Sequence, residues 1–393
     1  MALSPTFPSA SEVEAFCAEN AGKEPLQLRL KKSKPPQFET LLNQLEVRSQ
    51  MSERFGPLIE CPGYVFPPKS KLSQASSCAT ALWRGRELGL TLTKGSRVWD
   101  VTGGSGVDTW GLEMAGFHTL VTEPDRGLAA LHVHNSRILG TEREVHGVAS
   151  EQFTPEVPVD ALYVDPSRLD TDGNRVYHPK DCFPNPLVEL PRWLEQAENV
   201  WIKLSPMVDP DEVLHWFPNV QAVYLLSVHR EMKEVLVHVT RQPNLAPGRS
   251  AIDLYPDGTE RYRFAIDPQA QKPTLDHPRT YLYDADAALV AGRGIPTLAE
   301  TFAMQQLHPD SRLLTSHVLH TDFPGRVFQV DGIHAPFKGD WPNGASVVVR
   351  GYPDKADSIR SQMKLKENAE HYLLATVWGE TERGFIAARR VGA

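Results

Sequence analysis

The sequence predicts an α/β fold built around a parallel sheet. Between about residues 97 and 241, short apolar segments typical of strands alternate with segments typical of helices. Alternation at this spacing favours a parallel sheet with helices on both faces. Within it, residues 98–116 read VWDVTGGSGVDTWGLEMAG, an apolar strand that passes through a glycine-rich turn into a helix.

A further observation concerns the polar residues that end the expected strands. These residues are Asp100, Glu123, Ser150, Asp165 and Ser205. In open parallel sheets, ligands bind beyond the carboxyl ends of the strands. We therefore expect a ligand site at this edge of the sheet.

The expected elements follow in chain order. Residues 1–90 are predicted to be helical, with one helix over 38–56 and another near 72–88 that Ser73 caps. Strands are expected at 97–101, 118–123, 144–150, 159–166, 199–206, 221–229 and 234–241, with helices at 107–116, 126–140 and 186–196.

Prolines cluster between residues 242 and 280 and mark a domain boundary, with a hairpin expected around Pro256-Asp257-Gly258. Beyond it, strands are expected at 326–332, 345–353, 371–378 and 383–390, and a helix at 355–367. The predicted organisation is a helical N-terminal region (1–90), a ligand-binding α/β domain (91–242), a linker with a hairpin (243–278) and a small α+β domain (279–393).

Composition limits the class of protein. A hydrophobic content of 41% and a charged content of 23% are ordinary for a globular protein, and no apolar run is long enough to span a membrane. The first residues lack the features of a signal peptide, and the four cysteines are scattered without a CxxC motif, so we expect a cytoplasmic protein. The net charge of −8 excludes a uniformly basic nucleic-acid binder but not a local basic groove.

The glycine-rich turn places Asp100, Thr102, Gly104 and Gly106 on a D-x-T-x-G-x-G frame. The dinucleotide pattern G-x-G-x-x-G fits poorly, because Thr109 falls on its last glycine, and no G-K-[ST] follows. An acid at the strand end would repel a pyrophosphate but suits the amino-acid part of S-adenosylmethionine. A plain tight turn between strand and helix remains the alternative.

Glu123 ends the next strand, 17 residues after Gly106. A carboxylate at this position can accept hydrogen bonds from both hydroxyls of a ribose. Sites for NAD and for S-adenosylmethionine share this arrangement, and a solvated acid would give the same pattern.

The segment DPSR at 165–168 follows a strongly apolar strand. It resembles the D/N-P-P-x signature that methyltransferases place beside the transferred methyl group, although an ordinary Asx–Pro turn would also explain it. Lys203, at the end of another strand, is interpreted either as a cation for a nucleic-acid phosphate or as a strand residue with its amine at the surface. Cys182 is not favoured as a nucleophile, because it lies in the loop HPKDCFPNP.

Metal binding is not expected, because His132 and His134 have no third ligand at a suitable spacing. Two short basic runs offer contacts for a nucleic acid. The first contains Arg29, Lys31, Lys32 and Lys34; the second contains Arg360, Lys364 and Lys366. In the second run, positions 360 and 364 would share one face of the expected helix.

Together, several segments resemble a known family. They are DVTGGSGVDT, TEPD, YVDPSRLDTDGNRVYHPKDCFPNP, IKLSPMVD and SVHREMKEVLV, with KLSQASSCATALWR upstream and residues 355–390 at the C-terminal end. The set resembles class I S-adenosylmethionine-dependent methyltransferases that carry a THUMP-like domain, a group associated with RNA modification. The resemblance implies a Rossmann-like seven-stranded sheet and a C-terminal THUMP-like α+β domain.

The resemblance also implies roles for individual residues. Asp100, Thr102, Gly104, Gly106, Asp108, Glu123 and Ser150 would bind the cofactor S-adenosylmethionine, with Glu123 on the ribose and Ser150 near the adenine. Asp165, Pro166, Ser167 and Arg168 would face the methyl acceptor. Gln74, Lys203, Arg360, Lys364 and Lys366 would contact the substrate.

The predicted function is therefore methyl transfer from S-adenosylmethionine to a nucleic acid, with RNA as the expected class. A non-catalytic RNA-binding or assembly factor with a retained methyltransferase fold is the first alternative, since a fold alone does not fix an activity. A small-molecule methyltransferase is the second. An NAD(P)-dependent oxidoreductase is disfavoured by the glycine spacing.

Overall fold

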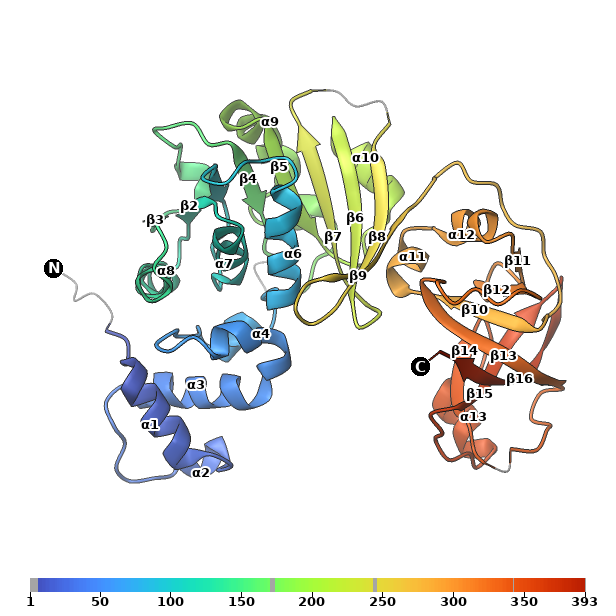
Figure 1. Cartoon of the computed structure of the whole chain (residues 1–393). Helices are drawn as coiled ribbons and strands as arrows, with labels where there is room; N and C mark the ends of the chain where they lie inside the picture. The colour runs from blue at the N-terminus through green and yellow to red at the C-terminus, as the bar shows by residue number, and fades with distance from the viewer. Residues whose placement is uncertain (1–5, 170–173, 243–245, 342, 393) are drawn as a thin grey trace. The chain divides into compact units, whose positions relative to one another are not determined.

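A computed structural model of the chain describes residues 6–169, 174–242, 246–341 and 343–392 (Figure 1). The chain divides into two compact units. The first comprises residues 1–229, 233–247 and 254–261, and the second comprises 230–232, 248–253 and 262–393.

The first unit begins with a helical region. Its helices are α1 (Ala10–Asn20), α2 (Pro25–Arg29), α3 (Phe38–Gln50), α4 (Ser52–Ile59), α5 (Lys69–Leu72) and α6 (Cys78–Leu88). The single helix expected over 38–56 is divided in two, because Met51 has the non-helical angles φ −126° and ψ 20°. The second expected helix, α6, starts later than predicted: Ser77 rather than Ser73 is its cap, accepting a hydrogen bond from the Thr80 backbone N–H.

A mixed sheet follows the helical region. Its parallel strands are β1 (Arg97–Asp100), β2 (His118–Thr122), β3 (Arg143–His146), β4 (Ala161–Val164) and β5 (Asn199–Leu204). The later strands are β6 (Val220–Val228), β7 (Glu231–Thr240), β8 (Gly248–Leu254) and β9 (Glu260–Ala265), and β7 runs antiparallel to β5.

The strand order is β3-β2-β1-β4-β5-β7-β6-β8-β9, so the sheet has nine strands rather than the expected seven. The two extra strands come from the hairpin in the segment predicted to be a linker, where the Tyr255 N–H donates to the Thr259 carbonyl at 2.9 Å. Residues 243–245 of that segment lie outside the described residues. A hairpin beside an exposed sheet edge gains hydrogen bonds by joining it.

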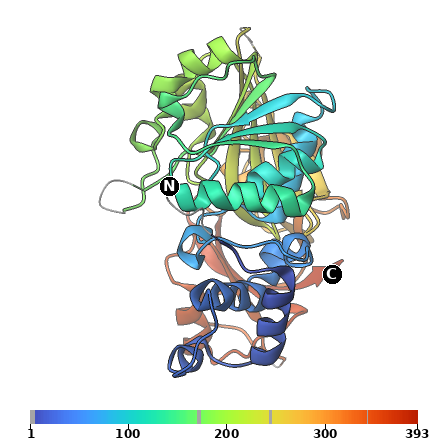
Figure 2. The ribbon, with the colours of Figure 1, turned by 90° about the vertical axis from the view of Figure 1, so that its left-hand side faces the viewer.

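The strand order reverses between β1 and β4, and this reversal places helices on both faces. The connecting helices are α7 (Val107–Met114), α8 (Arg126–Leu139), α9 (Pro186–Gln196) and α10 (Pro210–Trp216), with 3₁₀ turns at Ser150–Gln152 and Pro179–Asp181. Right-handed crossovers put α7 and α8 on one face of the sheet and α9 and α10 on the other. Figure 2 shows α8 in front of the sheet, above the N-terminal helices.

The helical region shares a hydrophobic core with the sheet domain. Phe55, Tyr64 and Phe66 from the helical region pack in one buried cluster with Val107 and Trp110 of α7. The Asn135 side chain of α8 exchanges two hydrogen bonds with the backbone of Val65, at 3.0 and 2.9 Å. These contacts hold the segment before α6 over the glycine-rich turn.

The second unit contains a seven-stranded sheet of its own, ordered β11-β12-β10-β13-β16-β15-β14. Its elements are β10 (Tyr281–Ala285), α11 (Ala287–Ala291), α12 (Ile295–Thr301), β11 (Gln305–Gln306), β12 (Leu313–Ser316), β13 (Gly325–His334), β14 (Ser346–Arg350), α13 (Ala356–Gln362), β15 (His371–Trp378) and β16 (Glu382–Val391). Within it, the helix expected over 355–367 ends at Gln362, and Lys364 has a φ of +51°. Arg360 and Lys364 therefore do not share a helix face as predicted.

The structure also bears on membrane-spanning helices and on the state of the cysteines. Across the described ranges we find no helix with the length and apolarity that a membrane crossing requires. All four cysteines are free thiols.

Helices α6 and α7 pack backbone against backbone at two glycines. A Cβ on Gly85 would overlap the carbonyl oxygen of Gly111, and a Cβ on Gly111 would overlap the carbonyl oxygen of Ala81. This close approach places the start of α7, and with it the glycine-rich turn, against the N-terminal end of α6.

We therefore expect Gly111→Ala to lower the free energy of unfolding by about 1–3 kcal/mol, because the added methyl group forces the two helices apart. The matched control is Gly56→Ala in α4, where a Cβ meets nothing within 4 Å and the better helix propensity of alanine should be neutral or stabilising. Urea denaturation of both variants measures the difference. Equal stabilities for the two variants would contradict the packing described.

Candidate functional site

A cavity of about 280 Å³ lies at the carboxyl ends of β1, β2 and β4, at the point where the strand order reverses. Most of the predicted site residues line it: Gln74, Thr102, Gly104, Asp108, Glu123, Ser150, Asp165, Pro166, Ser167 and Arg168. The structure thus brings together residues that lie far apart in the sequence, at the place that α/β sheets use for ligands.

Asp100 fixes the glycine-rich turn by hydrogen bonds to residues in the turn and in α7. One carboxylate oxygen accepts a hydrogen bond from the Thr102 backbone N–H at 3.1 Å, and the other accepts one from the Thr109 hydroxyl at 2.5 Å. The side chain is buried, and neither Asp100 nor Gly106 is part of the cavity lining. The structure therefore gives Asp100 a supporting position instead of the predicted contact with a ligand.

The turn itself depends on glycine. Gly104 and Gly106 have φ values of +53° and +80°, which side chains rarely adopt. Gly103, which the sequence reading did not single out, has no room for a side chain: a Cβ there would lie 2.6 Å from Val121 and 2.9 Å from His132.

Glu123 closes the cavity beside the turn. Its two carboxylate oxygens accept hydrogen bonds from the backbone N–H groups of Gly104 and Asp125, both at 2.8 Å. Each oxygen keeps a second lone pair, so the carboxylate can still accept two hydroxyl groups. Burial raises the pKa of Glu123, and the backbone donors oppose that rise.

Asp165 directly follows β4, which lies on the other side of β1 from the strand that precedes Glu123. Its backbone N–H donates to the Thr102 hydroxyl at 2.7 Å, which ties the end of β4 to the end of β1. Its carboxylate oxygen Oδ2 accepts a hydrogen bond from the Lys203 amine at 2.7 Å. The side chain is only a quarter exposed, and it lines the cavity.

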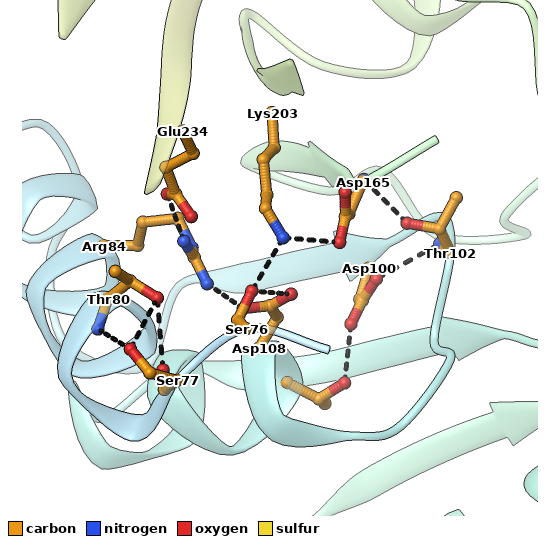
Figure 3. Close-up of polar contacts among 11 residues, drawn as sticks. Ser76, Ser77, Thr80, Arg84, Asp100, Thr102, Asp108, Asp165, Lys203 and Glu234 are labelled. Atoms are coloured by element: carbon orange, nitrogen blue, oxygen red, sulfur yellow. Dashed lines mark hydrogen bonds and ion pairs between the residues drawn. The ribbon is translucent and has the colours of Figure 1, made fainter. Parts of the chain in front are cut away.

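Behind Asp165, a chain of polar groups crosses the domain (Figure 3). Lys203 also donates to the Ser76 hydroxyl at 2.8 Å, and Ser76 donates to Asp108 at 2.9 Å. Arg84 of α6 joins Asp108 to Glu234 of β7 through two ion pairs. Lys203 is 7% exposed and does not line the cavity, so it supports Asp165 instead of making the predicted substrate contact.

Sequence reasoning missed three members of this chain: Ser76, Arg84 and Glu234. A signal existed for Glu234, since an acid directly before the apolar run of β7 is expected to be buried and then has to be paired. Nothing local distinguishes Ser76 from its serine neighbours or Arg84 from an ordinary helix cation.

Backbone hydrogen bonds fix the two residues that follow Pro166. Ser167 and Phe183 exchange backbone hydrogen bonds of 2.7 and 3.0 Å, and the Val176 N–H donates to the Arg168 carbonyl at 2.8 Å. Phe183 and Pro184 join the cavity lining. Residues 170–173, which belong to the segment that carried the family resemblance, lie outside the described residues.

The surroundings of Cys182 and His132 bear on whether these residues could act as a nucleophile or a metal ligand. Burial raises the pKa of Cys182 to about 11, and its thiol faces the carbonyl of His178 at 3.6 Å. Burial and the nearby Arg143 lower the pKa of His132 to about 3, which keeps this histidine neutral. Within the described residues, no group of three or more His, Cys, Asp or Glu side chains could hold a metal ion.

None of the residues in the two basic runs is part of the cavity lining. Arg29 lies near Glu39 and Glu46, at 3.5 and 3.6 Å, and Arg360 lies near Asp357 and Glu367, at 3.4 and 3.2 Å. These carboxylates offset much of the positive charge on which the substrate prediction relied. Lys364 and Lys366 follow the end of α13 and are exposed.

Comparison with known proteins supports the architecture. A model described as a ferredoxin-like domain matches residues 281–324 of the second unit. Over 98% of this chain and 100% of the other, the structure is similar to that of a "putative methyltransferase from Porphyromonas gingivalis W83", with a TM-score of 0.83 and 24% identity. At this identity the similarity shows a common fold.

Two further structures match with low scores. One is a "putative RNA methyltransferase" from Pyrococcus horikoshii (TM-score 0.32, 16% identity, 44% of this chain and 89% of the other). Another is a "putative class i s-adenosylmethionine-dependent methyltransferase" from Listeria monocytogenes (TM-score 0.34, 12% identity, 61% of this chain and 83% of the other). Scores this low carry no argument about this chain, and no curated protein matches the sequence. The THUMP-like description of the C-terminal part stays a prediction.

Burial makes Asp100 a pH-dependent element of stability. Its pKa is raised to about 6, because desolvation outweighs the hydrogen bonds from Thr109 and Thr102. In the unfolded chain an aspartate titrates near about 3.9. Between these values the folded state binds the additional proton, so the contribution of Asp100 to the free energy of unfolding falls as the pH rises and is constant above about pH 6.

We therefore expect the difference in unfolding free energy between the wild type and Asp100→Asn to fall by up to about 1.4 kcal/mol per pH unit between pH 4 and 6. His132 and His238, whose pKa values burial lowers to about 3 and about 4, titrate in the opposite sense and cancel in this difference. Denaturation series at several pH values provide the measurement. A difference independent of pH would show that Asp100 titrates normally.

Proposed function

We propose that this protein is an S-adenosylmethionine-dependent methyltransferase that acts on RNA. The observation that carries the proposal is a single cavity in which Glu123 and Asp165 stand on either side of a glycine-rich turn. One carboxylate suits the ribose of the methyl donor, and the other suits the hydrogen-bond donor of a methyl acceptor.

The residues at the donor end fit S-adenosylmethionine. Glu123 is held by two backbone N–H groups and retains lone pairs for the two ribose hydroxyls. Ala149 and Ser150 line the cavity beyond Glu123, where an adenine would lie, while Gln74 and Asp108 border the end expected to hold the amino acid. When bound, S-adenosylmethionine supplies an electrophilic methyl group on a positively charged sulfur.

The residues at the acceptor end position a nucleophile. The Lys203 amine donates a hydrogen bond to Oδ2 of Asp165, so Oδ1 is the oxygen available to accept one from an amino or hydroxyl group. Alignment of the reacting atoms contributes much of the rate in such a transfer. Asp165 orients the acceptor and can take up its proton when the acceptor loses one.

RNA as the acceptor class rests on the family resemblance of the sequence, and nucleoside analysis tests it. Ribosomal and transfer RNA from cells with and without the gene should differ by the loss of one methylated nucleoside, measured by mass spectrometry. Binding of S-adenosylmethionine without any lost nucleoside would favour a small-molecule acceptor. Absence of S-adenosylmethionine binding in calorimetry would instead favour a non-catalytic factor.

Asp165→Ala should reduce methyl transfer at least a hundredfold, because the acceptor loses its hydrogen-bond acceptor and general base. The affinity for S-adenosylmethionine should change less than threefold, since Glu123 and the glycine-rich turn are intact. Calorimetric titration and incorporation of a labelled methyl group separate the two effects. Retained turnover would remove Asp165 from the proposed mechanism.

Glu123→Gln should show the converse effect. An amide offers one acceptor oxygen where the carboxylate offers two, and its NH₂ group faces a backbone N–H donor, so the affinity for S-adenosylmethionine should fall about tenfold to a hundredfold. Glu144→Gln on β3 is the control, because Glu144 is outside the cavity lining and pairs with Arg97. Similar dissociation constants for both variants would contradict the assignment of Glu123 to the ribose.

A further inference from the structure

We infer that the acceptor is an unpaired nucleotide of RNA, whose base packs on the ring of Phe183 and whose phosphate pairs with Arg168. This inference rests on the proposed function and assigns the acceptor side of the same cavity. The roles proposed so far for the glycine-rich turn and Asp165 leave these two side chains of the cavity wall without a function.

Phe183 is an exposed aromatic ring in the wall of the cavity. The residue is 60% exposed, although large apolar side chains are usually buried in a folded domain. Its backbone exchanges two hydrogen bonds with Ser167, two residues after Asp165. The ring is therefore attached to a fixed loop segment next to the carboxylate that orients the acceptor.

The ring offers one kind of contact. An aromatic face in water binds another flat ring, and bases stacked on aromatic side chains contribute much of the affinity of proteins for single-stranded nucleic acid. Asp165 supplies the hydrogen-bond acceptor that an exocyclic amino group of such a base requires. A flat ring with a polar edge therefore fits both Phe183 and Asp165.

Arg168 supplies the charge that distinguishes a nucleotide from a neutral aromatic compound. Two other cations lie at or behind the cavity wall, and both have carboxylate partners: Lys71 lies 3.5 Å from Asp125, and Lys203 lies 2.7 Å from Asp165. Among the described residues, the Arg168 guanidinium has no hydrogen-bond or ion-pair partner, and it lines the cavity. A guanidinium that has no carboxylate partner and lines a cavity can bind a phosphate through two parallel hydrogen bonds.

The arrangement also selects the state of the nucleotide. A base inside a duplex has its two faces covered by its neighbours and its Watson–Crick edge occupied by its partner. To reach Asp165 at the carboxyl ends of the strands and to lie on Phe183, the base has to be outside a duplex. The favoured substrate is therefore a loop, a bulge or a single strand.

The first test uses labelled S-adenosylmethionine and total RNA from cells that lack the gene. Phe183→Ala should lower kcat/KM for RNA about tenfold to a hundredfold, Phe183→Leu should lower it similarly, and Phe183→Trp should retain most of it, because stacking needs a flat ring. Tyr177→Ala is the control, since Tyr177 is 52% exposed on the same loop but does not line the cavity. Unchanged affinity for S-adenosylmethionine in each variant shows that the fold is intact.

The second test addresses the phosphate. Arg168→Ala should weaken RNA binding and reduce the slope of log affinity against log salt by about 0.7, the value for one contact to a single strand. Arg175→Ala, an exposed arginine of the same loop that is outside the lining, should leave the slope unchanged. Fluorescence anisotropy of a labelled single-stranded RNA, with duplex RNA as competitor, gives these values.

The outcomes separate this inference from the proposed function. If the wild type methylates RNA and Phe183→Ala or Phe183→Leu does so at the wild-type rate, the stacking assignment is wrong and the proposed function stands. Equal competition by duplex and single-stranded RNA would also overturn it. If the wild type binds S-adenosylmethionine but neither binds nor methylates RNA, both the RNA assignment and this inference are wrong.

Discussion

The geometry of the site depends on the two hydrogen bonds that the buried Asp100 carboxylate accepts. They join the end of β1 to Thr102 in the turn and to Thr109 in α7, so the turn has one shape. That shape aims the Gly104 N–H at Glu123 and places the Thr102 hydroxyl where the Asp165 backbone can donate to it. The spacing between Glu123 and Asp165 is thus set by a residue whose side chain bonds to neither.

The polar chain behind Asp165 fixes the orientation of its carboxylate. Buried ion pairs contribute little net stability, because desolvation offsets much of the attraction between the charges. A paired and hydrogen-bonded carboxylate, however, keeps one rotamer, and preorganised groups of this kind are effective at a reacting centre. We therefore interpret Lys203, Ser76 and Arg84 as positioning residues. Lys203 bonds to Asp165 and to Ser76, and Arg84 pairs with Asp108 and Glu234.

The sequence predicts those residues of the candidate site that follow directly from the strand pattern. Glu123 and Asp165 were predicted because each ends a strand, and parallel strands bring their carboxyl ends together. The supporting position of Asp100 was not predictable, since it depends on whether its oxygens are already occupied. Ser76 and Arg84 both reach Asp108 only because the segment that ends in α6 packs on α7, and Lys203 reaches Ser76 from β5; no local pattern records these contacts. The early end of α13 and the addition of β8 and β9 to the sheet are likewise decided by tertiary contacts.

The composition of the polar chain has a consequence for turnover. Asp108, Asp165 and Glu234 contribute three negative charges, and Arg84 and Lys203 contribute two positive charges, so the polar chain itself carries one net negative charge. A sulfonium donor has one more positive charge than the thioether that remains after methyl transfer. Under the proposed function, this net negative charge favours the sulfonium donor over the thioether, and the difference would help the product to leave after each cycle.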